Sequence, residues 1–118
     1  MSEVAVYLEQ VEAFERITPM KADELLEAKA GHIVFIGRET WGFCRKFVRT
    51  LSDVAKANSL SIHYVHAQDS DYTQEIQVFR NKYDIPTVPG FLFSNENGIK
   101  VKCDSSMSAD QILSFVNA

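Results

Sequence analysis

The chain has 118 residues, 46% hydrophobic and 24% charged, which is the composition of one globular domain and argues against a disordered chain. Its 12 Lys and Arg against 16 Asp and Glu give a net charge of -4, so it lacks the basic excess of a nucleic-acid-binding protein. No apolar run is long enough to cross a bilayer and two cysteines are too few for a secreted disulfide framework, so we expect one soluble cytoplasmic domain over residues 1–118.

Hydrophobic spacing in the first quarter of the chain predicts a helix, a short strand and a second helix. Apolar residues recur at helical intervals over 3–13, and a short strand is expected around 14–18. Thr18 stands before a proline, which is typical of an N-cap followed by the first helical position. The second helix is therefore predicted over 19–30, with Gly31 ending it.

The middle of the chain continues the alternation. Residues 32–37 form a compact apolar run bounded by glycine, which predicts a buried strand. A long helix is expected over 42–58 and a further strand over 61–66. Asp71 is then predicted to cap the next helix.

The last third of the chain predicts a hairpin and a final helix. Two short apolar strands, 91–94 and 99–103, are joined by Asn95-Glu96-Asn97-Gly98, a typical hairpin loop. Ser108 followed three residues later by Gln111 predicts a capping box at the start of the last helix. The whole order predicts an α/β fold with a mixed central sheet of about five strands, helices on both faces and an extra N-terminal helix.

Cys44 is the first residue of chemical interest, because it lies at the start of the long helix directly after the strand 32–37. A helix N-terminus lowers the pKa of a thiol. Residues 38–56 include five basic and two acidic residues, a local charge of +3, whereas the rest of the chain has seven basic and fourteen acidic residues. This favours a thiolate at Cys44, provided that the sulfur is not sealed in apolar packing. The alternative is a small buried residue in the first helical turn.

Four separated segments carry a resemblance to a known family: Ile36-Gly37-Arg38, Cys44-Arg45-Lys46-Phe47, the run Tyr83–Phe91 and the run Cys103–Ser108. In this order they resemble the thioredoxin-like superfamily and, more narrowly, the bacteriocin transport accessory proteins of Gram-positive bacteria. The match covers roughly residues 14–117. It implies a thioredoxin fold and, as partner, a peptide or protein such as a bacteriocin or its export machinery.

The resemblance also implies a role for Val88 and Pro89. Pro89 would be the cis-proline that faces the active site, and Val88 would offer its backbone to an extended peptide. Pro86 is the other candidate in this stretch. Because 91–94 forms the strand interior, Pro89 lies at the mouth of the strand and Pro86 in the preceding loop.

Two departures from the family pattern decide what chemistry is left. The usual Cys-x-x-Cys is replaced by Trp41-Gly42-Phe43-Cys44, so Trp41 occupies the position of the nucleophilic cysteine and Cys44 that of the resolving one. Phe35 falls where thioredoxins carry a buried aspartate that helps proton transfer. Dithiol oxidoreductase activity is therefore not expected.

Two functions from different classes remain. The first is a binding protein that holds an extended peptide at a Trp41/Pro89 surface formed with Gly42, Phe43 and Val88. Trp41 would then be an exposed apolar anchor, although it could instead fold back and fill the groove. The second is an enzyme in which Cys44 is catalytic and exchanges disulfides as a single thiol with glutathione or a client protein.

The remaining candidate ligands favour neither a metal nor a cofactor. His63 and His66 lie three apart on a strand, so they face opposite sides and read as ordinary surface or edge histidines. Cys103 stands on the last strand, where the resemblance favours a packing role. Whether it approaches Cys44 is open, because a disulfide needs Cα atoms within about 7 Å.

Overall fold

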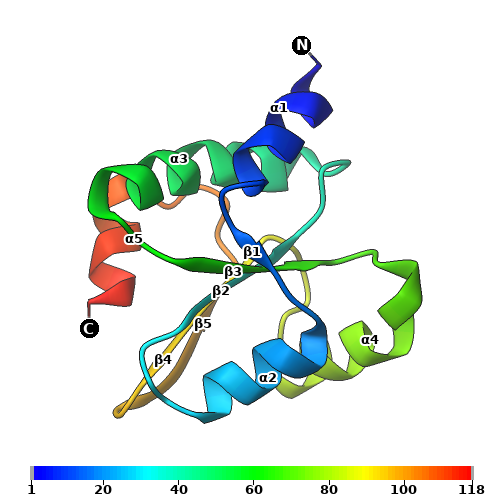
Figure 1. Cartoon of the computed structure of the whole chain (residues 1–118), viewed down its shortest axis with the longest axis vertical. Coiled ribbons are helices and arrows are strands. Elements are labelled where there is room, and N and C mark those ends of the chain that lie inside the picture. The colour runs from blue at the N-terminus through cyan, green and yellow to red at the C-terminus, as the bar shows by residue number, and fades with distance from the viewer. Residues whose placement is uncertain (1, 118) are drawn as a thin grey trace.

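The computed structural model describes residues 2–117, and in it five strands form one sheet between two layers of helices (Figure 1). The helices are α1 (Glu3–Val11), α2 (Pro19–Glu27), α3 (Gly42–Asn58), a short 3-10 helix η1 (Ser70–Tyr72), α4 (Thr73–Lys82) and α5 (Ala109–Val116). The strands are β1 (Glu15–Arg16), β2 (Ile33–Gly37), β3 (Ile62–His66), β4 (Gly90–Asn95) and β5 (Gly98–Lys102). The predicted α/β alternation, N-terminal helix and late hairpin are confirmed.

The sheet is mixed and has the order β1-β3-β2-β4-β5. Strands β1, β3 and β2 run parallel, whereas β4 is antiparallel to β2 and β5 is antiparallel to β4. All five residues of the central strand β2 are buried, because helices cover both faces of the sheet. This explains why its sequence is an unbroken apolar run rather than an alternating one.

Helices α1, α3 and α5 lie on one side of the sheet, and α2 and α4 lie on the other (Figure 1). A row of aromatic rings fills the core between α3 and the sheet. The ring of Phe47 lies 5.6 Å from Phe35 and 5.4 Å from Phe91, measured between centroids. No helix within residues 2–117 has the length and hydropathy of a membrane-spanning segment.

Local capping signals set several helix ends as predicted. The Thr18 side chain accepts a hydrogen bond of 3.1 Å from the Lys21 N–H at the start of α2. Ser108 and Gln111 form the predicted capping box of α5, each accepting from the other's backbone N–H. Helix α3 has the predicted limits, 42–58.

The helix predicted over 3–13 ends at Val11, and two further predicted elements are also too long. Helix α2 ends at Glu27 and not at Ala30, because Lys29 takes the left-handed conformation (φ 53°) and breaks the helix before Gly31 does (φ 89°). The strand expected over 14–18 is reduced to β1, because only Glu15 and Arg16 pair with β3.

The predicted cap at Asp71 is wrong. Asp69 is the residue that caps, since its side chain accepts a hydrogen bond of 3.1 Å from the Asp71 N–H and begins η1. The longer helix α4 follows from Thr73, and its N-cap residue, Tyr72, makes no side-chain cap. Asp69, two residues before the predicted cap, thus accepts from one of the free N–H groups at a helix start, as Asp71 was expected to do.

Candidate functional site

The candidate site is the turn that connects the carboxyl end of β2 to the N-terminus of α3. The N-cap of α3 is Trp41, which has an extended backbone and no side-chain cap. Its carbonyl accepts hydrogen bonds from the N–H groups of Cys44 (3.0 Å) and Arg45 (3.1 Å). Main-chain bonds therefore set the direction of the turn and leave the Trp41 side chain available for other contacts.

Trp41 and Phe43 form an exposed aromatic ridge at this turn. Their side chains are 39% and 53% exposed, and their ring centroids lie 5.3 Å apart in an edge-on arrangement. The guanidinium carbon of Arg38 lies 5.3 Å from the centroid of the Trp41 ring. Trp41 is therefore exposed at the turn and not buried in the interior.

Cys44 follows Phe43 in the sequence and is fully buried. Burial raises the pKa of its thiol, and the opposing effects of a backbone hydrogen bond from Arg38 and of the Arg38 and Arg45 charges are smaller. The condition that the sequence analysis set for a thiolate, a sulfur not sealed in apolar packing, is therefore not met, because removal of the sulfur from water outweighs the helix N-terminus and the nearby cations. Packing there is tight, since a Cβ atom on Gly37 would lie 3.1 Å from the Cys44 sulfur.

The Val88–Pro89 peptide bond is cis, and both residues are buried. Val88 is 7% exposed and belongs to the hydrophobic core. The predicted Trp41/Pro89 surface therefore needs correction, because the accessible apolar area belongs to the aromatic ridge and not to Pro89. Gly42, which separates Trp41 from Phe43 in the sequence, is also exposed.

Arg80 holds the loop that leads to this cis bond, a role that the sequence analysis missed. Its Nε donates to the Ile85 carbonyl (3.0 Å) and its Nη2 to the Pro86 carbonyl (2.9 Å). An arginine in the last turn of a helix has no sequence signal that distinguishes it from a solvent-exposed one. The hydrogen-bond partners of Arg80 are known only from the way the loop packs against α4 in the structure.

Phe35 occupies the interior beneath the turn and is fully buried. Its ring stacks on Tyr64 with a centroid distance of 5.4 Å and an interplanar angle of 17°. The ring of Phe14 lies edge-on at 6.4 Å. The position at which the resemblance expects an aspartate in thioredoxins is thus the centre of an aromatic cluster.

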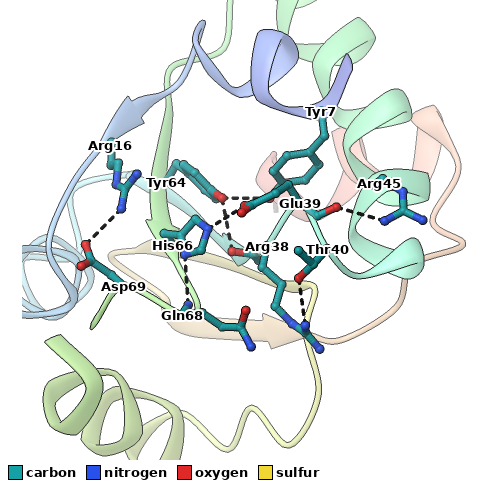
Figure 2. A network of polar contacts seen from close by, with 11 residues as sticks. Tyr7, Arg16, Arg38, Glu39, Thr40, Arg45, Tyr64, His66, Gln68 and Asp69 are labelled. Carbon is teal, nitrogen blue, oxygen red and sulfur yellow. Dashed lines mark hydrogen bonds and ion pairs between the residues drawn. The ribbon is translucent and has the colours of Figure 1, made fainter. Parts of the chain in front are cut away.

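Two tyrosines beside Phe35 form a buried chain of hydrogen bonds (Figure 2). The Tyr64 hydroxyl donates to the Gly37 carbonyl at 3.3 Å, and the Tyr7 hydroxyl lies 3.0 Å from that of Tyr64. Because a phenol has one proton, Tyr7 donates to Tyr64. Burial raises the pKa of both phenols, so both stay protonated at neutral pH. Tyr7 comes from α1, the helix that the family resemblance does not cover.

Glu39 and His66 connect the turn to β3 (Figure 2). His66 Nε2 lies 2.6 Å from the Glu39 carboxylate, and its Nδ1 accepts from the Gln68 N–H, so Nε2 carries the proton. Burial alone would raise the pKa of Glu39, but the hydrogen bonds from its own backbone and from His66 lower it overall. Arg45 Nη1 donates to the Glu39 carbonyl and ties the same loop to α3.

The histidines and cysteines do not form a metal site. His63 pairs with Glu15 at 3.0 Å and His66 with Glu39 at 2.6 Å, and both histidines are half-buried. Both cysteines are free thiols. Within residues 2–117, no three His, Cys, Asp or Glu side chains gather where they could hold a metal ion.

Comparison with solved structures shows which architecture surrounds this turn. Thioredoxin from Aeropyrum pernix superposes with a TM-score of 0.60 at 16% identity, over 83% of this chain and 80% of that one. Fasciola hepatica thioredoxin superposes with a TM-score of 0.62 at 16% identity, over 88% of this chain and 97% of that one. This chain has the thioredoxin fold. No protein-family model and no curated protein matches its sequence.

The thioredoxin fold thus carries an aromatic ridge, a buried thiol and a tyrosine pair, and the tyrosine pair can be tested directly. We expect Tyr64→Phe to lower the free energy of unfolding by about 2 kcal/mol, because it leaves the buried Tyr7 hydroxyl without an acceptor. Tyr7→Phe should cost about 1 kcal/mol, because the bond from Tyr64 to Gly37 survives. Urea unfolding of both variants provides the comparison.

The double variant is the control for this pair. Removal of both hydroxyls leaves no orphaned donor, so Tyr7→Phe/Tyr64→Phe should be more stable than Tyr64→Phe alone. Equal losses for the two single variants, or additive losses in the double variant, would contradict the proposed direction of the hydrogen-bond chain.

Proposed function

We propose that this chain is a binding protein of the thioredoxin fold that holds an extended peptide or partner protein over its aromatic ridge. The observation that carries the proposal is that Trp41 and Phe43 are exposed at a helix start whose own thiol, Cys44, is buried. Large exposed aromatic side chains are the usual anchors of interfaces.

The class of partner follows from the resemblance to bacteriocin transport accessory proteins. We propose that the guest is a peptide such as a bacteriocin, or a component of its export machinery, in the cytoplasm of a Gram-positive bacterium. The support for this is the four separated segments that agree in order with that family. The two solved thioredoxins, at 16% identity, support the fold alone.

The second candidate function is monothiol disulfide exchange through Cys44. The basic residues around the helix start favour it, because cations and free N–H groups stabilise a thiolate. The burial of the Cys44 sulfur opposes this function, because the sulfur must reach the disulfide bond of the exchange partner in order to attack it. The binding function requires no such opening, and for that reason we prefer it.

The binding function is tested by removing the ridge. A displayed random-peptide library is first selected on the wild-type protein. We expect the variant Trp41→Ser/Phe43→Ser to capture none of the selected peptides, because no apolar anchor remains. Trp41 is the only tryptophan of the chain, so its fluorescence measures binding of each selected peptide directly. The matched control is Met20→Ser/Val78→Ser, which removes two exposed apolar side chains from α2 and α4 and should leave capture unchanged. If the ridge variant enriches the same peptides as the wild type, the proposed site is wrong.

A further inference from the structure

The arginine that lies over the ridge has unused hydrogen-bond donors. One guanidinium nitrogen of Arg38, Nη1, donates to the Thr40 hydroxyl at 3.0 Å. Within residues 2–117 this guanidinium forms no ion pair with a carboxylate. A guanidinium has five N–H donors in a rigid plane, so most of those on Arg38 are available to a bound molecule.

Glu39 follows Arg38 directly in the sequence, and Asp104 lies two residues before the serine that Lys46 contacts; both carboxylates accept hydrogen bonds elsewhere. Glu39 binds His66 at 2.6 Å, and Asp104 accepts from the Ser106 backbone N–H at 2.8 Å. Lys46, the fifth residue of α3, donates to the Ser106 hydroxyl at 2.9 Å and likewise has no carboxylate partner among the described residues. Arg38 beside the ridge and Lys46 near the start of α3 are therefore cations without a carboxylate partner among the described residues, on a chain whose net charge is -4.

Resting on the proposed function, we infer that the guest peptide is acidic: it carries an Asp or Glu side chain beside the apolar residue that packs on the ridge. The apolar residue would contact Trp41 and Phe43 while the neighbouring carboxylate binds Arg38. Stacking on Trp41 already holds the guanidinium in place, so less rotamer freedom is lost when the carboxylate binds. A planar guanidinium also binds a carboxylate with two parallel hydrogen bonds. A lysine at the same guest position would be repelled.

The test uses a random-peptide library displayed with both peptide ends fused to the carrier, so that only side chains can supply a carboxylate. The wild-type protein is expected to enrich Asp or Glu next to an apolar residue. For a selected peptide, replacing that acidic residue by its amide should weaken binding on the order of fivefold, and the difference should shrink as salt increases. Tryptophan fluorescence provides the dissociation constants.

Arg38→Gln should remove the preference for the acidic peptide over its amide, measured as the ratio of the two dissociation constants. Lys56→Gln is the matched control, because it removes the same charge from an exposed position in the last turn of α3 and should leave the preference intact. Peptides that bind without any acidic preference, or a preference that survives Arg38→Gln, would overturn this inference alone. A failure to enrich any peptide would overturn the proposed function and the inference with it. If the wild-type protein is a dimer and the variant Trp41→Ser/Phe43→Ser is a monomer, a second copy of the chain occupies the ridge. That result would also overturn the inference.

Discussion

Replacing Phe35 by aspartate is expected to leave the domain largely unfolded at neutral pH. The change removes a fully buried ring that packs on Tyr64, Phe47 and Phe14, and a loss of that size costs about 3–5 kcal/mol by itself. It also places a carboxylate among aromatic rings with no hydrogen-bond donor provided for it. Together these effects approach the whole stability of a small domain, about 5–15 kcal/mol. Circular dichroism during urea titration measures the loss.

The pH dependence of this variant separates the charge from the lost packing. Desolvation would raise the pKa of the new carboxyl in the folded state above its unfolded value. The folded state is then disfavoured as pH rises through that higher pKa, so Phe35→Asp should be more stable, relative to the wild type, at acid pH than at neutral pH. Phe35→Leu is the control, with an expected loss of about 1.5 kcal/mol and no pH-dependent difference from the wild type. A well-folded Phe35→Asp protein at neutral pH would show that this position tolerates the aspartate that the resemblance expects.

The second large effect concerns the reactivity of Cys44. We expect its native-state reaction with an aromatic disulfide reagent to be slower than in the denatured protein by roughly three orders of magnitude, because the sulfur becomes accessible only when the domain opens. The raised pKa acts in the same direction, since the reactive thiolate is scarce near neutral pH. The rate is followed by absorbance of the released thiol in a Cys103→Ser background, which isolates Cys44.

The complementary variant, Cys44→Ser, leaves Cys103 as the only thiol and allows the reaction rates of the two cysteines to be compared in the same fold. Cys103 is partly exposed, so its thiol should react well before that of Cys44, although burial raises its pKa too. Fast, saturating reaction of Cys44 in the folded protein would support monothiol exchange and would remove the main reason for preferring a binding function.

Features set by neighbouring residues were predictable from the sequence. The capping box of Ser108 and Gln111, the N-cap Thr18 and the limits of α3 all depend on hydrogen bonds or periodicity within a few residues. The alternation of elements was sufficient to predict the mixed sheet with helices on both faces, because parallel strands need helical crossovers and the last hairpin must be antiparallel. The sequence also placed the ridge and Cys44 at one helix start.

The tertiary structure alone decided how those site residues behave. The helix start and cations favour a thiolate at Cys44, but the packing against Phe35 and Gly37 that buries it comes from β2 and outweighs them. Tyr7 and Tyr64 are 57 residues apart, and nothing local to either predicts their hydrogen bond. Desolvation and buried hydrogen bonds depend on which distant segments surround a group, whereas caps and periodicity depend on its neighbours in the chain. For this reason the sequence determined where the site lies, and the packing of α1, β2 and β3 determined that its thiol is buried and its aromatic ridge exposed.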